Sequence, residues 1–194
     1  MYTVTDEPNI EALVLTMNGG LPAIVEGVRF ERPLTRDSVL PPPPELGTVW
    51  FARDLGLPLP VIVEGAGAGP TPAERIRSRI GTLMRGPTPA VPEDTFNTLT
   101  RLRALLVDIV IEGDLAVLDF APTEDGWGLH GAATLRAFVQ QIVFTVTEEP
   151  GIARVLITEN GGLAVIGGEG LVVDRPITRT ELIEQAYGSD QRER

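Results

Sequence analysis

Apolar and polar residues follow two periods along the chain, and these periods predict strands and helices. Residues 48–53 and 60–65 are short runs rich in β-branched and aromatic residues, which predicts two strands. Over residues 73–84 the apolar positions recur at helical spacing, with Arg75, Arg77 and Arg79 mostly on the other side. Residues 71–74, Thr-Pro-Ala-Glu, predict the start of this helix, because a capping box coincides with proline at the first helical position. Gly86-Pro87 predicts its end.

A second strand pair and helix follow. Residues 105–122 form two apolar runs joined at Gly113-Asp114, which predicts a hairpin with Val107, Ile109 and Ile111 on one side. The next helix should pack one apolar stripe against the sheet, formed by Leu135, Phe138, Val139, Ile142, Val143 and Val146. Asn160-Gly161 predicts a tight hairpin, and Thr178-x-x-Glu181 predicts the cap of a short last helix.

The order is therefore ββα, ββα, then a hairpin and a short C-terminal helix. Strand pairs that alternate with single helices are typical of an α+β fold. We expect an antiparallel or mixed sheet with the two main helices on one face.

The first residues of the chain repeat part of this second half. The run YTVTDEPNIEALVLTMNGGLPAI from Tyr2 matches FTVTEEPGIARVLITENGGLAVI from Phe144, so that Asn18 corresponds to Asn160. The run RPLTR at Arg32 returns as RPITR at Arg175. A repeat of this length indicates a duplicated domain.

The repeat and the proline run together predict the domain boundaries. Residues 1–40 are expected to be the C-terminal fragment of a first domain. Residues 41–46 are expected to be a stiff linker, since four consecutive prolines favour polyproline II. We assign residues 47–188 to a complete domain and residues 189–194 to a disordered tail.

Composition narrows the function classes. Hydrophobic residues make up 43% of the 194 residues, which suffices for a core. The absence of cysteine excludes disulfides, thiol nucleophiles and the cysteine of a lipobox. The net charge of −11 argues against nucleic acid and anionic membrane surfaces as partners. No apolar run approaches the ~20 residues that span a bilayer, and any export signal is expected upstream of Met1.

Catalytic residues are scarce, and we predict no catalytic, cofactor-binding or metal site. His130, the only histidine, lies between glycines, where a polar loop residue is expected. The serines at 38, 78 and 189 form no nucleophile elbow. Gly65, Gly67 and Gly69 precede a helix, but all 16 basic residues are arginine, so a phosphate loop lacks its lysine. We expect a flexible turn there.

Three acidic or aromatic features leave alternatives open. One hairpin carries four acidic residues, Asp108, Glu112, Asp114 and Asp119. They form either a solvated face of the hairpin, or the paired carboxylates of a glycosidase, or a calcium site. Trp50 is expected in the core; Trp127 either packs over a helix end or anchors a contact. Glu148 and Glu149, echoed by Asp6 and Glu7, either solubilise a helix end or form an acidic corner that faces a partner.

Several segments resemble a known family. The matching segments are VWFAR, LMRGPTP, VPEDT, VIEGDLAVLDF, QQIVFTVTEEPGIARVLITENG and DRPITR, in this order. Together they resemble the sporulation and spore-germination GerM domain over residues 47–185, and residues 2–40 resemble its C-terminal part. The chain departs from the family at Ala121, where serine is frequent, and in a longer segment over residues 95–105.

The resemblance implies a non-enzymatic domain without cofactors, similar to the ring-building domains of envelope assemblies. It implies an interaction or scaffold role in an extracytoplasmic, membrane-anchored protein of bacteria, with protein partners or copies of itself. A small-molecule or glycan-binding module is the alternative, and a hydrolase comes third. A scaffold should expose an apolar patch or a sheet edge, whereas a ligand module should have one concave site with convergent polar groups.

Overall fold

The structure is a computed structural model that describes residues 46–53, 57–86, 95–167 and 171–188, together with the backbone of four short strands nearer the N-terminus. These strands are β1 (Ala12–Leu13), β2 (Ala23–Val25), β3 (Val28–Phe30) and β4 (Leu34–Thr35). The chain divides into two compact units, Met1–Pro43 and Pro44–Arg194. Each unit is described by itself.

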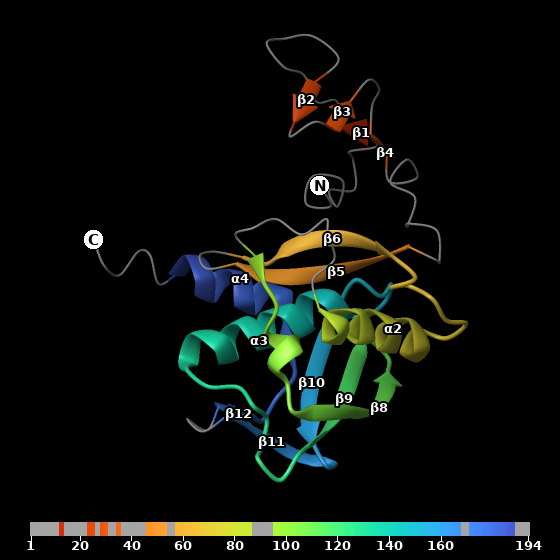
Figure 1. Cartoon of the computed structure of the whole chain (residues 1–194). Coiled ribbons are helices and arrows are strands. Elements are labelled where there is room, and N and C mark those ends of the chain that lie inside the picture. The colour runs from red at the N-terminus through yellow and green to blue at the C-terminus, as the bar shows by residue number, and fades with distance from the viewer. Residues whose placement is uncertain are drawn as a thin grey trace. The chain divides into compact units, whose positions relative to one another are not determined.

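The second unit contains two sheets (Figure 1). The smaller sheet has the order β6-β5-β7 and consists of β5 (Leu46–Arg53), β6 (Leu59–Glu64) and β7 (Thr95–Phe96). The larger sheet has the order β12-β11-β10-β9-β8. Its strands are β8 (Ala104–Glu112), β9 (Leu115–Pro122), β10 (Arg154–Glu159), β11 (Gly162–Ile166) and β12 (Leu171–Val173). A further short strand, β13 (Ile177–Thr178), also pairs with β10.

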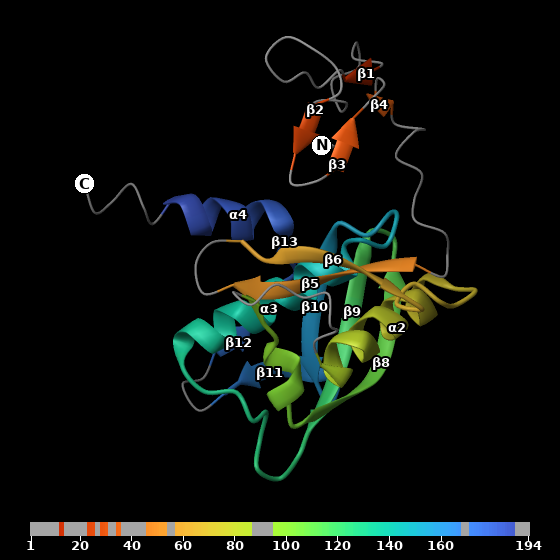
Figure 2. The ribbon, with the colours of Figure 1, turned by 45° about the horizontal axis from the view of Figure 1, so that its top comes forward.

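The larger sheet is mixed, because β9 and β10 run parallel while its other pairs are antiparallel. The helix that connects these two strands is α3 (Ala132–Val146). It lies beside α2 (Pro72–Arg85) between the two sheets, as Figures 1 and 2 show. A four-residue 3₁₀ turn (Thr98–Arg101) and α4 (Arg179–Gly188) complete the unit. The predicted α+β fold with a mixed sheet and the predicted element order are confirmed.

The single apolar stripe predicted for α3 is too narrow. Eleven of its fifteen residues are buried, including Gln141 and Thr145, which have no exposed surface. Gln141 accepts hydrogen bonds from the backbone and hydroxyl of Thr98 and donates one to the carbonyl of Trp50. Thr145 accepts one from the amide of Trp50. A helix packed between two sheets needs polar side chains where it faces buried backbone groups, because those N–H and C=O groups require hydrogen-bond partners.

The predicted start of α2 is confirmed in detail. Thr71 caps the helix through the amide of Glu74, and the Glu74 carboxylate accepts a hydrogen bond from the Thr71 amide. This bonding lowers the pKa of Glu74, with the Thr71 side chain as the larger cause. The expectation that the arginines lie mostly outside is wrong for Arg79, which is 6% exposed.

A β-bulge corrects the pattern predicted for β8. The register with β9 shifts between Leu106 and Asp108, so Val107 falls out of the alternation and is 54% exposed. Ile109 is buried and Ile111 is half-buried, as predicted. At the bulge, the Arg77 guanidinium of α2 donates to the carbonyls of Leu106 and Val107 over 3.1 and 3.3 Å.

The described strands of the first unit pair in the same manner as the end of the second. Ala12 faces Thr35 and Leu13 faces Leu34, as Arg154 faces Thr178 and Val155 faces Ile177. These four pairs are equivalent positions of the sequence repeat. The hairpin at Asn160-Gly161 has positive φ at both residues, as the sequence predicts. Asn18, Gly19, the linker prolines and the tail lie outside the described residues.

Candidate functional sites

The hairpin acids do not converge on one site. Asp114 lies at the turn and is bonded to Arg154 over 2.5 Å, which lowers the pKa of its carboxyl. Asp108 and Asp119 face each other across β8 and β9, and Glu112 lies at the far end of β8. No cluster of three or more acidic or histidine side chains suited to a metal ion is found in the described part of the chain. The arrangement therefore favours the solvated face over the calcium site.

Glu149 is buried, and both interpretations of the Glu148–Glu149 pair as a solvent-facing corner are wrong for it. Its side chain is 1% exposed and meets two arginines of α2, Arg75 over 2.5 Å and Arg79 over 2.7 Å. The hydrogen bond to Glu149 raises the pKa of Arg75. Arg79 Nε is buried without a hydrogen-bond partner among the described residues. This carboxylate holds α2 against the end of α3.

Glu148 belongs to the same structural junction. Its carboxylate accepts hydrogen bonds from the Trp50 indole over 3.0 Å and from Arg179 of α4. The Arg179 guanidinium also lies over the rings of Trp50 and Phe144, 5.1 Å from each centroid. Trp50 is half-buried and packs against the core. The two glutamates thus connect α2, α4 and β5 to the end of α3. Both carboxylates form ion pairs with arginines.

The remaining sequence candidates have structural roles or none. Trp127 is 4% exposed, packs against Phe120 and Phe138, and donates its indole hydrogen to Glu159. Trp127 is therefore a core residue and not a surface anchor. His130 is exposed in the loop before α3. Ser78 donates to the carbonyl of Gly65, while Ser38 and Ser189 lie outside the described residues.

The glycine-rich loop forms a turn that packs closely against β5 and α2. Ala66 is fully buried, and its backbone passes so close to Gly47 that a Cβ there would lie 2.4 Å from it. Arg75 Nη1 donates to the carbonyls of Gly69 and Pro70. The amides of Ala66 and Ala68 already donate to the carbonyls of Val63 and Gly65, so they are not free to cradle a phosphate.

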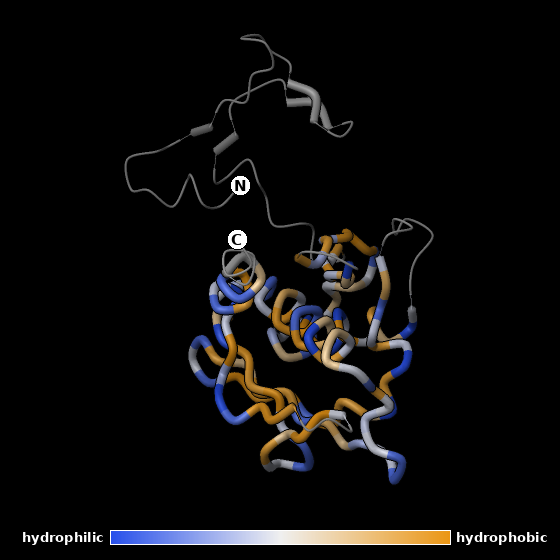
Figure 3. Tube along the Cα trace, turned by 90° about the vertical axis from the view of Figure 1, so that its left-hand side faces the viewer, coloured by the Kyte–Doolittle hydropathy of each residue, from blue (hydrophilic) through white to orange (hydrophobic). Residues whose placement is uncertain are grey.

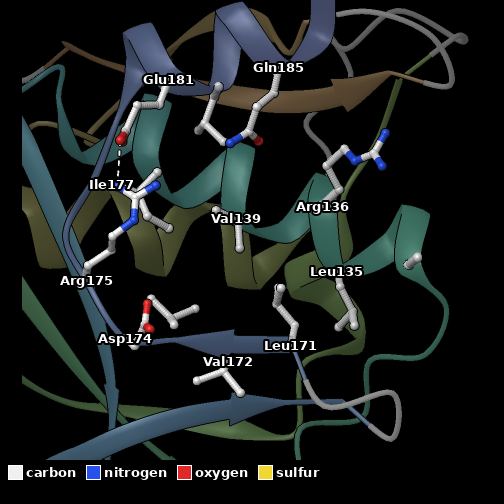
Figure 4. A pocket seen from close by; sticks show the side chains of 13 residues that line it. Leu135, Arg136, Val139, Leu171, Val172, Asp174, Arg175, Ile177, Glu181 and Gln185 are labelled. Atoms are coloured by element: carbon white, nitrogen blue, oxygen red, sulfur yellow. Dashed lines mark hydrogen bonds and ion pairs between the residues drawn. The ribbon is translucent and has the colours of Figure 1, made fainter. Parts of the chain in front are cut away.

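The first surface feature that the sequence analysis missed is a pocket of about 650 Å³ between α3, α4 and β12 (Figure 4). Leu135 and Val139 of α3 and Leu171 of β12 contribute apolar walls. Arg175 bridges to Glu181 over 2.5 Å at one side, and this bond lowers the pKa of Glu181. None of the described lining residues is aromatic.

The second missed feature lies on the other face of the larger sheet, where Figures 1 and 2 show no described helix or strand of this unit. Val110 pairs with Val117, Val117 with Leu156, and Val165 with Val172. The β10–β11 register, continued from Thr158 and Leu163, brings Leu156 beside Val165. One apolar residue from each of five strands therefore forms a continuous line, called here the open-face row: Val110, Val117, Leu156, Val165 and Val172.

The open-face row is exposed at three of its five residues and half-buried at Val117 and Leu156. Val110, Val165 and Val172 are 44%, 50% and 51% exposed, and Leu105 and Leu163 on the same face are 68% and 63% exposed. At the usual strand spacing the row extends about 19 Å across the sheet. Figure 3 shows how strongly apolar the strands of this sheet are. The signal in the sequence was an apolar residue at solvent-side positions of all five strands, where polar residues usually alternate with the core.

The family assignment comes from sequence comparison. The family model described as Germane: Sporulation and spore germination matches residues 57–164, more than half of the chain. The chain belongs to this family. The Germane match covers both main helices, the larger sheet through β10 and the first part of β11.

Three solved structures are similar to this member of the Germane family. A protein from Clostridium perfringens that is assigned as a lipoprotein is 18% identical, with a TM-score of 0.47, over 69% of this chain and 87% of that chain. The tandem GerMN domains of the sporulation protein GerM from Bacillus subtilis are 21% identical, with a TM-score of 0.49, over 69% and 45%. The first GerMN domain alone is 14% identical, with a TM-score of 0.49, over 70% and 98%. No curated protein matches the chain significantly.

Proposed function

We propose that this chain is a non-enzymatic interaction module that contributes a protein-binding surface to a sporulation-associated assembly of the cell envelope. The observation that carries the proposal is the open-face row, because contiguous apolar patches on a protein surface often mark interaction sites. Membership of the Germane family supports the sporulation context.

The proposed location and domain architecture rest on the resemblance to the same family. We propose an extracytoplasmic protein, anchored by a segment outside this chain, in which residues 1–40 belong to a first copy of the domain. The matching strand registers of the two units support the tandem arrangement. No described helix is long and apolar enough to cross a membrane.

Photo-crosslinking in the native host tests the interaction role. A photoreactive residue at Val165 should give one reproducible crosslinked protein, and Val172→Ser should reduce its yield. The matched control is Ile62 of β6, which is 64% exposed but lies outside the larger sheet. Equal crosslinking from Ile62 and Val165, or a yield that Val172→Ser leaves unchanged, would count against a specific interface.

We also predict that the isolated protein has no hydrolase activity. Asp108 and Asp119 are cross-strand neighbours but do not line the described pocket, and Asp114 is bonded to Arg154. His130 is exposed and lacks a described hydrogen bond to a serine. The measurement is turnover of glycan, ester and peptide substrates by the purified chain. Turnover that disappears on mutation of the hairpin acids Asp108, Glu112, Asp114 and Asp119 would overturn the non-enzymatic assignment.

A second candidate function is the binding of a small apolar ligand in the pocket between α3, α4 and β12. Its volume of about 650 Å³ falls in the range of small-molecule sites. The absence of aromatic residues among its described lining favours such a ligand over a glycan. Val139→Trp would fill the pocket, and ligand-induced shifts that persist in this variant would exclude the site.

A further inference from the structure

We propose that the open-face row binds a basic, apolar segment of a protein partner, whose Arg or Lys side chains pair with Asp108 and Asp119. This inference rests on the proposed function and adds to it the chemistry of the partner. It also accounts for the acidic hairpin that the sequence analysis singled out and that no catalytic or metal site explains.

The two aspartates form a like-charge pair that has no ion pair with a described arginine. They are direct cross-strand neighbours in β8 and β9. Asp108 accepts a hydrogen bond from the adjacent Ile109 amide, and Asp119 accepts from the Thr158 hydroxyl and the Gly161 amide. No described arginine contacts either carboxylate. Like charges placed directly opposite each other destabilise a sheet. A cation from a partner would remove this repulsion between Asp108 and Asp119.

The aspartates lie directly beside the open-face row. Asp108 is two residues from Val110 on β8, and Asp119 is two residues from Val117 on β9, so each acid shares the face of its valine. The spacing is about 7 Å along the strand. A complementary partner therefore presents a line of apolar side chains and, about 7 Å from that line, its cationic side chains.

The charge of the whole hairpin supports a cationic partner. Glu112 and Asp114 add two carboxylates, while Arg154 supplies one guanidinium, which is paired with Asp114. Anionic lipids and nucleic acids would be repelled from this face. A second copy of the chain would bring the same acids and the same net charge of −11 to the contact.

The test uses the full chain, labelled with ¹⁵N, and two synthetic amphipathic peptides. One peptide consists of Leu and Arg, and the other has Glu in place of each Arg. We expect the Leu–Arg peptide to shift the amide resonances of Val110, Val165 and Val172, and the Leu–Glu peptide to bind at least tenfold more weakly. Val165→Ser should weaken the binding of the Leu–Arg peptide, whereas Ile62→Ser should leave it unchanged.

Charge variants separate the aspartate pair from general attraction to an acidic protein. Asp108→Asn should lower the affinity for the Leu–Arg peptide by a factor of about two to five, the range for an exposed charge pair. It should not lower the melting temperature, because it relieves the repulsion with Asp119. The matched control Glu124→Gln removes an exposed acid outside the hairpin strands and should leave the affinity unchanged.

Three results would overturn the inference. Equal weakening by Asp108→Asn and Glu124→Gln would show unspecific attraction, and equal affinity for both peptides would remove the role of charge. If neither peptide shifts the amide resonances of the open-face row, a basic partner on this face is excluded. The proposed function would survive each of these results if the Val165 crosslink still formed and depended on Val172, so the two hypotheses fail separately.

Discussion

At the scale of single residues, adjacent glutamates at the end of α3 differ in environment. Glu149 is buried between Arg75 and Arg79, while Glu148 is partly exposed and bonded to Trp50 and Arg179. The sequence could not reveal this, because the arginines of α2 lie 70 and 74 positions away. A helical arginine is expected to be solvated unless a buried acid from another element faces it, and only the fold brings the two together.

We predict that Glu149→Gln lowers the free energy of unfolding by about 3–5 kcal/mol, because it leaves buried guanidinium charge without a counter-charge. Denaturant melts measure the effect. The control is Asp114→Asn, which breaks the exposed pair with Arg154 and should change stability far less. Equal effects of the two substitutions would show that burial of the Glu149 cluster has no energetic weight.

At the scale of elements, the order of strands and helices could be predicted and the partition of strands between sheets could not. The capping box at Thr71, the turn at Asn160 and the cap at Thr178 are local signals, and all three are present. Nothing local distinguishes a β5–β6 hairpin that extends the larger sheet from one that covers the helices. Traces of that second layer in the sequence are Phe144, an apolar residue outside the predicted stripe, and the buried Gln141 and Thr145 of α3.

For α3 itself, we predict that Phe138→Ala costs about 3–5 kcal/mol, the usual range for a buried phenylalanine. Phe138 is fully buried and its ring lies 6.3 Å from that of Phe120 and 6.0 Å from that of Trp127. Denaturant melts give the free energy, and the near-UV circular dichroism of Trp127 should change with it. A loss below about 1 kcal/mol would contradict close packing around this ring. Phe96→Ala, at a position that is 37% exposed, should cost less.

At the scale of the whole molecule, the repeat predicts a fragment followed by a complete domain. One cluster of buried apolar residues in the second unit runs from Val49 to Leu182. The domain limits at residues 40, 46 and 188 remain predictions, since much of the first unit lies outside the described residues. The open-face row was harder to predict than the fold, because it depends on strand register, which brings Val110 and Val172 into one line.

We predict that deletion of residues 1–44 leaves the melting temperature of the remaining chain nearly unchanged. The deletion removes no residue of the described core cluster and ends two positions before β5. Thermal and denaturant melts of the full and shortened chains provide the comparison. A loss of more than about 2 kcal/mol would mean that the segment contributes to the core of the second unit, and the two-domain organisation would then be wrong.

Arg77 has a consequence for how the domain grows into larger structures. The strand at the end of a sheet offers unpaired carbonyls on which another chain can add a strand, and repeated addition leads to fibres. Arg77 already occupies the carbonyls of Leu106 and Val107, at the point where the bulge interrupts β8. Polymerisation through this end of the sheet is thereby obstructed. If the open-face row binds a partner as proposed, the covered β8 edge favours that contact over open-ended strand addition at this end of the sheet.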